Sequence, residues 1–385
     1  DYNIVNIKLN FKLMEFSLFI NGTNRSRLIY SEIQIFKGSI GMNISIVGAS
    51  GYGGLELIRL LQNHPYFKIV SLHSSSKAGQ DIDEENPHLS HLSQKFMPID
   101  PEVMARESSI VFLATPSGVS TQLAPQFLEA GLKVIDLSGD LRLKNQDSYR
   151  QWYKKEPAEE NILSQAVYGL SEWNAENIKN ADLIANPGCF PTAILLGLAP
   201  LTQQQWCEPN GIIIDAKSGV SGAGRTASMA TMFSELNENF KIYKVHQHQH
   251  IPEIEQQLQW WQEDIGAIEF STHLVPMTRG IMATMYVQLK ESVTTEQLID
   301  LYKATYEKHH FVRIQPEGRY PSTKQVSGSN YCDISISVNE RTGRVTIVSV
   351  IDNLVKGAAG QAVQNANLLC GYEEMTGLQF VPQYP

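Results

Sequence analysis

The chain has 385 residues, a length that suggests two or three folding units. Hydrophobic residues make up 42% and charged residues 18%, an ordinary globular composition, and the formal net charge of −9 argues against a nucleic-acid partner. Every apolar run is far shorter than the ~20 residues that cross a bilayer, so we expect no membrane partner either.

Residues 1–41 show no sustained apolar period and lack the apolar core and cleavage site of a signal peptide. A buried-strand pattern begins directly after Met42, which makes Met42 the natural start of the fold. We therefore expect residues 1–41 to be an N-terminal extension without a function of its own.

The first predicted elements are a strand at residues 44–47, a glycine-rich loop at 48–54 and a helix at 55–62. Glycines allow a tight turn and a close approach of backbone to a pyrophosphate, and the helix N-terminus attracts that anion. A plain structural turn is the alternative, but strand and helix on either side favour dinucleotide binding. The candidate cofactor residues are Gly48, Ser50, Gly51, Tyr52 and Gly53.

A second strand is predicted at residues 67–72, followed by a polar loop. NAD-specific folds place an acidic residue there, on the ribose 2′-hydroxyl. This loop instead carries Ser74, Ser76 and Lys77, which can accept a 2′-phosphate that a carboxylate would repel. An ordinary polar loop is the alternative for each serine, but together the residues favour NADP(H).

Strands at 110–114 and 133–137 enclose a helix at 119–129. This alternation predicts an α/β fold with a parallel, doubly wound sheet, in which ligands bind at the carboxyl ends of strands. Thr115 and Pro116 follow one strand, and Arg142 follows the next. They are candidate ligand contacts, with a Pro-Gly turn and an exposed charge as the competing interpretations.

Cys189 follows a Pro187-Gly188 turn and precedes an apolar helix. A helix N-terminus stabilises a thiolate and lowers its pKa, as a nucleophile requires, although a lone cysteine is more often a small buried residue. The other cysteines are widely spaced, without a CxxC pair. Disulfide frameworks belong to small, Cys-dense secreted chains, so we expect reduced thiols and a cytoplasmic protein.

His246, His248 and His250 alternate with glutamines just before a Pro-Glu pair. In an extended chain the three imidazoles would face one side, as in a metal site. A general base for Cys189 and a merely polar segment are the other interpretations. We favour the base and expect no metal, because a thiol nucleophile needs a nearby base rather than an ion.

Two further loops carry candidate ligand residues. Ser221, Gly222 and Arg225 lie in a Gly-rich segment after a strand at 211–216, where backbone could approach a ring or a phosphate. Arg279 stands beside Gly280 and suits a carboxylate or phosphate. A flexible turn and a solvated arginine are the respective alternatives.

Six motifs occur in one order: GASGYGG, NPGCFPTA, SGVSGAGR, the histidine segment with PEIEQ, HLVPMTRGI and DNLVKGAAGQAVQN. In this combination the chain closely resembles the N-acetyl-γ-glutamyl-phosphate reductases over residues 42–385. The first and last motifs are shared with the related aspartate-semialdehyde dehydrogenases, whose nucleophile usually lies in an Asn-Cys-Thr setting. The Pro-Gly-Cys-Phe-Pro-Thr setting of Cys189 matches the reductases.

The resemblance implies reductive dephosphorylation of N-acetyl-γ-glutamyl phosphate by NADPH, in arginine biosynthesis, through a thioester on Cys189. The family's acid/base histidine falls at His248 or His250, and we favour His250; Gln249 stands where an arginine is common. Asn353 would lie near the nicotinamide. The candidate substrate ligands are Arg142, Arg225 and Arg279.

The expected architecture is a Rossmann-like NADP-binding domain and an α+β catalytic and oligomerisation domain. The first comprises residues 42–187 and a returning helix at 357–385, and the second comprises 188–356. The resemblance also implies a homo-oligomer, a dimer or a tetramer.

Three alternatives stay open. One is an aspartate-semialdehyde dehydrogenase or another acyl-phosphate reductase of the same superfamily. A non-catalytic NADP(H) sensor would keep GASGYGG but would have no need of Cys189 and the histidines. A metal-dependent enzyme would use the histidine cluster, and metal analysis would separate it from the others.

Overall fold

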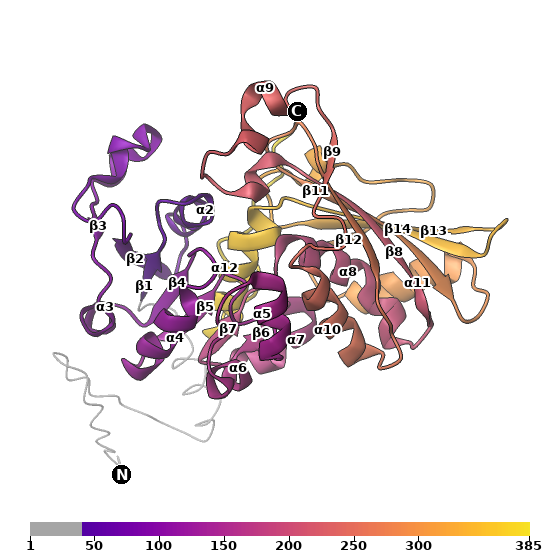
Figure 1. Cartoon of the computed structure of the whole chain (residues 1–385), viewed down its shortest axis with the longest axis horizontal. Coiled ribbons are helices and arrows are strands. Elements are labelled where there is room, and N and C mark those ends of the chain that lie inside the picture. Colours follow the sequence, from indigo (N-terminus) through magenta and orange to yellow (C-terminus); the bar gives the residue numbers. More distant parts are fainter. Residues whose placement is uncertain (1–40) are drawn as a thin grey trace, which may run out of the picture.

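A computed structural model describes residues 41–385, so the expectation about the N-terminal extension falls outside the described residues except for Gly41. Figure 1 shows two β-sheets side by side, with helices around each. The α/β fold class predicted from the sequence is confirmed, with a parallel sheet first and a mixed sheet second.

The first sheet has seven parallel strands in the order β3-β2-β1-β4-β5-β7-β6. Its central strands are largely buried, as in other parallel sheets, and the strand at residues 110–113 is apolar throughout. The strands are β1 (Met42–Val47), β2 (Phe67–His73), β3 (Phe96–Met97), β4 (Ile110–Leu113), β5 (Lys133–Asp136), β6 (Val167–Tyr168) and β7 (Leu183–Ala185).

Helices cover both faces of this sheet. The helices that precede or follow its strands are α2 (Tyr52–Leu61), α3 (Pro101–Glu107), α4 (Ser120–Glu129), α5 (Gln146–Tyr153), α6 (Glu160–Gln165) and α7 (Ser171–Lys179). On one face Leu57 of α2 packs in the same cluster as Val363 of α12 (Gly360–Leu369). On the other face Met104 of α3 packs with Phe127 of α4.

The second sheet has the order β12-β13-β14-β11-β8-β10-β9 and is mixed. Its pairings are antiparallel except for β12 with β13 and β8 with β10. Its strands are β8 (Cys207–Ser218), β9 (Lys241–Tyr243), β10 (Glu269–Leu274), β11 (Ile281–Leu289), β12 (Val312–Ile314), β13 (Cys332–Asn339) and β14 (Arg344–Ile351).

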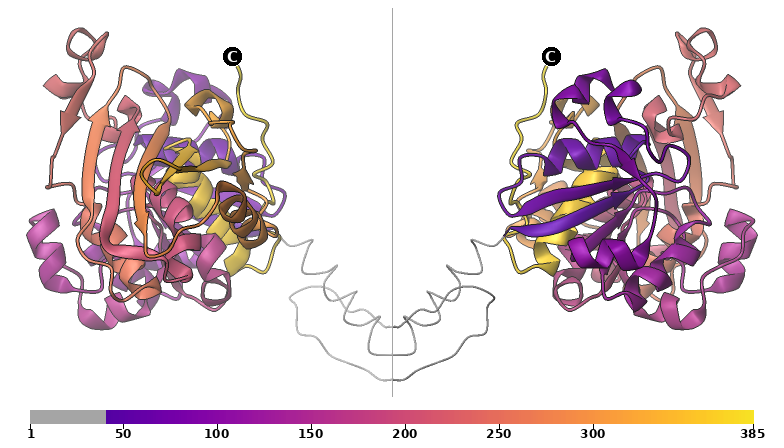
Figure 2. Two further views of the ribbon diagram at one scale, coloured as in Figure 1. Left: turned by 90° about the vertical axis from the view of Figure 1, so that its right-hand side faces the viewer. Right: turned by 90° about the vertical axis from the view of Figure 1, so that its left-hand side faces the viewer.

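One face of the second sheet is covered by α8 (Cys189–Gln203), α10 (Ile251–Trp261) and α11 (Thr295–Tyr306). The opposite face is more open, because β8 and β11 alternate buried and partly exposed residues (Figure 2). Although α8 is buried along most of its length, neither it nor another helix in residues 41–385 is long and apolar enough to span a membrane.

Two helices begin at other residues than the sequence predicted. Helix α2 begins at Tyr52 rather than at residue 55, because Gly53 and Gly54 form its first turn. The returning helix predicted at 357 begins instead as a π-helical turn, η6 (Val355–Ala359), followed by α12. The 3₁₀ turns are η1 (Ile82–Glu84), η2 (Pro87–Leu92), η3 (Val220–Ala223), η4 (Met229–Thr231) and η5 (Thr323–Val326).

Candidate active site

Cys189 is the first residue of α8, and Gly188 is the N-cap. The segment enters this helix from the carboxyl end of β7, at the boundary between the two sheets. The thiol is partly buried, and all four cysteines are free. The helix predicted from the Pro187-Gly188 turn is therefore present, with Cys189 at its N-terminus.

His250 lies beside the residue that precedes the cysteine. A Cβ on Gly188 would lie 2.6 Å from Nε2 of His250 and 2.9 Å from Nη1 of Arg142. Glycine at this position thus leaves room for an imidazole and a guanidinium next to the thiol. Nδ1 of His250 is buried and has no hydrogen-bond partner among residues 41–385.

His248 lies directly against His250 and accepts a hydrogen bond from it. Its Nδ1 accepts the main-chain N–H of His250 at 3.1 Å, and the two ring centroids lie 4.7 Å apart. Phe190 meets both imidazoles edge-on. Of the two candidate histidines, His250 has the nitrogen next to the cysteine loop. In the described part of the chain, no group of three or more His, Cys, Asp or Glu side chains is placed so that it could hold a metal ion.

Glu253, in the first turn of α10, connects the groups around Cys189. Its fully buried carboxylate accepts the Gly188 N–H and the Tyr168 hydroxyl, both at 2.8 Å, and Nη1 of Arg142 at 3.2 Å. Sequence reasoning noted this glutamate without giving it a role. The signal was the spacing His250-x-x-Glu253, which puts both residues at the start of one helix.

Arg142 is buried, and each of its described bonds is internal. Nε donates to the Asn186 carbonyl at 2.7 Å, and Nη2 donates to the Leu137 carbonyl at 3.0 Å. Together with the bond to Glu253, these contacts hold the loop in front of Cys189. The guanidinium hydrogen-bonds protein groups in this structure, so a direct contact between Arg142 and substrate stays a prediction.

Burial shifts the pKa values of the Cys189 thiol and of the two imidazoles toward their neutral forms. Burial raises the pKa of the Cys189 thiol to about 11, and the nearby Arg142 charge offsets this only in part. Burial lowers the pKa of His248 to about 3, and burial with the charges of His248 and Arg142 holds the pKa of His250 well below its usual range. The helix N-terminus favours a thiolate, whereas desolvation favours the neutral forms of the thiol and of the imidazole.

The glycine-rich loop has the geometry of a phosphate cradle. Gly48 has a φ of +79°, and a Cβ there would lie 2.3 Å from the Ala114 carbonyl oxygen, so only glycine fits. A Cβ at Gly51 or Gly53 would instead make an ordinary van der Waals contact, with the nearest atom at 3.6 Å or 3.8 Å. No side chain caps the first-turn amides of α2, which leaves them available to a pyrophosphate.

The remaining candidate cofactor residues of the first sheet follow neighbouring strands. Ser74 is buried after β2, with its hydroxyl 3.4 Å from that of Ser50. Ser76 is exposed and Lys77 forms an ion pair with Glu85. Thr115 follows β4 and its hydroxyl lies 2.9 Å from that of Ser120, whereas Pro116 is exposed. These side chains collect at the carboxyl edge of the sheet and fit a dinucleotide there.

The second sheet contributes the other wall. Asn353 donates from Nδ2 to the Ser221 hydroxyl at 2.9 Å and accepts the Gly280 N–H at 2.8 Å. A Cβ on Gly222 would lie 3.8 Å from the Asn353 amide. A pocket of about 380 Å³ joins this wall to the glycine-rich loop, with Tyr52, Ser221, Arg225, Arg279 and Leu354 among its lining residues.

Arg225 and Arg279 already have partners inside the protein. Arg225 donates to the Ser50 carbonyl at 2.9 Å and to Asn86 at 3.0 Å, so it links the second domain to the cofactor loop. Arg279 forms a bidentate pair with the buried Glu56 of α2, at 2.8 and 2.9 Å. The sequence predicted a carboxylate or phosphate partner for Arg279, with a solvated arginine as the alternative; its pairing with Glu56 of α2 could not be read from the motif. Substrate contact by either residue stays a prediction.

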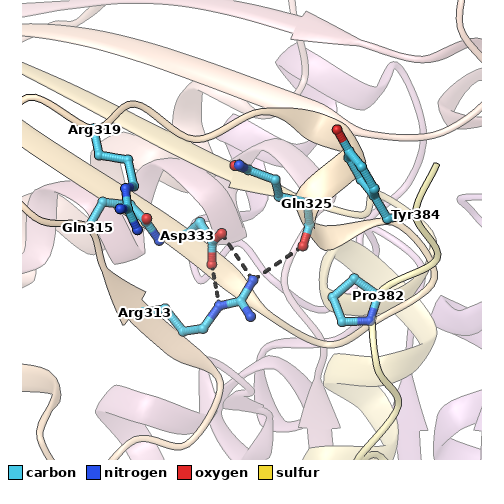
Figure 3. A pocket seen from close by; sticks show the side chains of 7 residues that line it. All are labelled: Arg313, Gln315, Arg319, Gln325, Asp333, Pro382 and Tyr384. Atoms are coloured by element: carbon cyan, nitrogen blue, oxygen red, sulfur yellow. Dashed lines mark hydrogen bonds and ion pairs between the residues drawn. The ribbon is translucent and has the colours of Figure 1, made fainter.

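A second pocket, of about 490 Å³, lies at the β12–β13 edge of the second sheet (Figure 3). Arg313 crosses it to form a bidentate pair with Asp333, at 2.6 and 3.0 Å. Its lining shares no residue with the surroundings of Cys189 or with the glycine-rich loop. None of the predicted site residues lines this larger pocket, so Cys189 and its surroundings remain the candidate active site.

Comparisons with known proteins agree with this geometry. Residues 43–181 match the family described as "Semialdehyde dehydrogenase, NAD binding domain", and residues 189–353 match "Semialdehyde dehydrogenase, dimerisation domain". N-acetyl-γ-glutamyl-phosphate reductases of Geobacillus sp. (strain WCH70) and Bacillus subtilis (strain 168) are each 58% identical to the chain over 345 residues. These alignments cover 89% of the chain and the whole of each relative.

The chain belongs to the N-acetyl-γ-glutamyl-phosphate reductase family. It is accordingly an oxidoreductase with an NAD(P)-binding domain, as the sequence motifs predicted. The family boundary between residues 181 and 189 contains the loop that carries Asn186 and Gly188 to Cys189. The nucleophile candidate thus opens the second domain.

Solved structures show the same fold at low identity. Aspartate semialdehyde dehydrogenase II of Vibrio cholerae matches with a TM-score of 0.66 at 19% identity, over 86% of this chain and 98% of that chain. The aspartate semialdehyde dehydrogenase of Candida albicans, solved with NADP, matches with a TM-score of 0.64 at 16% identity, over the same shares. These likenesses support the two-domain α/β fold alone.

Proposed function

We propose that the chain catalyses the NADPH-dependent reductive dephosphorylation of N-acetyl-γ-glutamyl phosphate to N-acetyl-glutamate 5-semialdehyde and phosphate, in arginine biosynthesis. The observation that carries this is the convergence of the cysteine at the start of α8, the buried imidazole and the guanidinium around Gly188. Relatives that are 57–58% identical and carry the reductase name support the substrate.

In the first step, Cys189 attacks the acyl carbon. Its Sγ–H proton passes to the neutral His250 as the sulfur–carbon bond forms and the carbon–oxygen bond to phosphate breaks, which leaves a thioester on the protein. A general base is needed because the thiol, with its pKa raised to about 11, is protonated at neutral pH. Arg142 then faces the imidazolium–phosphate pair from beside Gly188, where its charge favours the departing anion.

For the second step, NADPH held at the glycine-rich loop would provide the hydride that reduces the thioester carbon. The carbon–sulfur bond then breaks, the aldehyde is released, and His250 returns its proton to the sulfur. Glu253 holds the Gly188 N–H and Arg142 throughout, so the loop keeps its position while Cys189 changes its bonding.

The cofactor is NADP(H), and we propose that Gly48, Gly51 and the first turn of α2 hold its pyrophosphate, with Ser74, Ser76 and Lys77 near the 2′-phosphate. The positive φ of Gly48 and the first turn of α2, which no side chain caps, support this assignment. Arg225 and Arg279 line the pocket between the domains, where an anionic substrate group would meet them.

We further propose a cytoplasmic homo-oligomer. The four free thiols support a reducing compartment. The partly open face of the second sheet carries Ile213 and Tyr286, apolar residues that are 37% and 38% exposed. This face lies within the segment that matches the dimerisation domain, and a second copy of the chain would bury it.

The function is tested in the reverse direction. N-acetyl-glutamate semialdehyde, phosphate and NADP⁺ should produce NADPH in the presence of the purified protein, and omission of phosphate should stop the reaction. Aspartate semialdehyde is the control substrate. Faster turnover of aspartate semialdehyde would replace the proposal with the related dehydrogenase activity, and phosphate-independent turnover would reject acyl-phosphate chemistry.

The cofactor preference has its own test at Ser74. Ser74→Asp should weaken NADP⁺ binding by about tenfold or more, because a carboxylate next to the 2′-phosphate repels it by ~1.4 kcal/mol or more. NAD⁺ binding should change much less. Both dissociation constants are measured by titration, with Ser164→Asp, on an exposed position of α6, as the matched control. Equal weakening for both cofactors would place the 2′-phosphate elsewhere.

A further inference from the structure

The π-helical turn η6 lies directly against the cysteine. Its hydrogen bonds span five residues, from the Gly357 N–H to the Asp352 carbonyl at 3.0 Å and from the Ala359 N–H to the Leu354 carbonyl at 2.9 Å. A Cβ on Gly357 would lie 2.8 Å from Cβ of Cys189 and 3.2 Å from its Cα. The turn is therefore one wall of the site, and such turns are rare and concentrate at functional sites.

The cysteine loop is fastened to this turn. Asn186, three residues before Cys189, donates from Nδ2 to the Ala358 carbonyl at 3.1 Å. Its Oδ1 accepts a bond from Asn365 of α12 at 3.0 Å. A shift of the turn would consequently move both the loop that precedes Cys189 and the surface that contacts its Cβ.

Lys356, inside the turn, anchors it from behind. Its Nζ contacts Oε1 of Glu172, in α7, at 2.5 Å and donates to Oε1 of Gln364, in α12, at 2.8 Å. Gln364 also donates to Glu172 at 3.0 Å. The Lys356 and Glu172 side chains are both 0% exposed, so this is a fully buried ion pair outside the reacting groups.

Stability alone is a weak reason for such a pair. Removing two charges from water costs several kcal/mol per ion, and well-packed neutral residues of similar volume often give equal or greater stability. The Lys356 charge holds the pKa of Glu172 below its usual range although burial raises it. Neutral residues would not reproduce the directional contacts by which Lys356 and Glu172 join the turn to α7 and α12.

We propose that Lys356 and Glu172 are positioning residues for Cys189: their buried ion pair holds the π-turn in the register that packs Gly357 against the cysteine. The inference rests on the proposed role of Cys189 as nucleophile. Without this ion pair, the turn can relax toward α-helical hydrogen-bond spacing, and Gly357 then moves away from Cys189.

The test uses the double variant Lys356→Met/Glu172→Gln, which removes both charges but keeps side-chain length. We expect a melting temperature close to that of the parent protein, a kcat lower by about tenfold or more, and little change in KM for the acyl phosphate. Alkylation of Cys189 by iodoacetamide, followed by mass spectrometry without cofactor, should become several-fold faster, because the thiol loses cover. Partly buried Cys370, at the end of α12, should keep its rate.

The matched control is Arg313→Met/Asp333→Asn, which neutralises an ion pair at the β12–β13 edge and should leave kcat and Cys189 alkylation unchanged. A parental kcat in the Lys356/Glu172 double variant would overturn the proposal. Faster alkylation of Cys189 and Cys370 together, with a lower melting temperature, would show a merely structural pair and overturn it as well.

If the double variant fails to fold, Glu172→Asp decides, because it keeps both charges but shortens the side chain that reaches Nζ of Lys356. A reduced kcat with a parental melting temperature supports the positioning role, and unfolding of this variant too rejects it. Absence of the phosphate-dependent reaction in the parent protein would instead reject the proposed function.

Discussion

Cys189→Ser is expected to lower turnover by orders of magnitude while cofactor binding is retained. Serine keeps the shape of the side chain at the start of α8, so Gly357 and the loop before it need not move. An alcohol is a far weaker nucleophile at neutral pH than a thiol, and His250 is too weak a base to ionise it. The glycine-rich loop is untouched, so NADP⁺ should bind as in the parent protein.

Two measurements separate the chemical step from folding. Steady-state turnover of N-acetyl-γ-glutamyl phosphate reports the loss, and a rapid quench without NADPH should show an acyl adduct on Cys189 of the parent protein by mass spectrometry. Cys370→Ser is the matched control, because that thiol is also partly buried but lies outside the site. Near-normal turnover of Cys189→Ser would mean that the thioester mechanism has to be abandoned.

Local patterns in the sequence predicted the parts of the site that one segment encodes by itself. A strand, a glycine-rich loop and a helix specify where a pyrophosphate can approach, since Gly48 needs a positive φ and close contact with Ala114. Similarly, a Pro-Gly turn before an apolar run placed Cys189 at a helix N-terminus. These features depend on backbone conformation within a few residues, which is why the sequence is sufficient.

Contacts between distant segments could not be predicted in the same way. Arg142 and Glu253 are 111 positions apart, and only the docking of α10 beside the first sheet makes them partners. Lys356 and Glu172 are separated by 184 positions, and the motif around Lys356 predicted an ordinary helix rather than a π-turn. The raised pKa of Cys189 follows from burial, a property of the whole fold that a local argument from the helix dipole does not include.

His250→Asn should slow turnover by roughly 10²–10⁴-fold, the usual contribution of general acid–base catalysis. Its buried, neutral imidazole has Nε2 next to Gly188 and no described partner at Nδ1, so it can take the Cys189 proton and return it. His248→Asn should cost much less, because an amide oxygen can still accept the His250 N–H that Nδ1 of His248 accepts now. His246→Asn, at an exposed position, is the control for histidine loss as such.

Because His250 and Cys189 serve one proton transfer, Cys189→Ser/His250→Asn should be little worse than Cys189→Ser alone. A larger loss in His248→Asn than in His250→Asn would move the acid/base role to His248, and additive losses in the double variant would separate the histidine from the cysteine step.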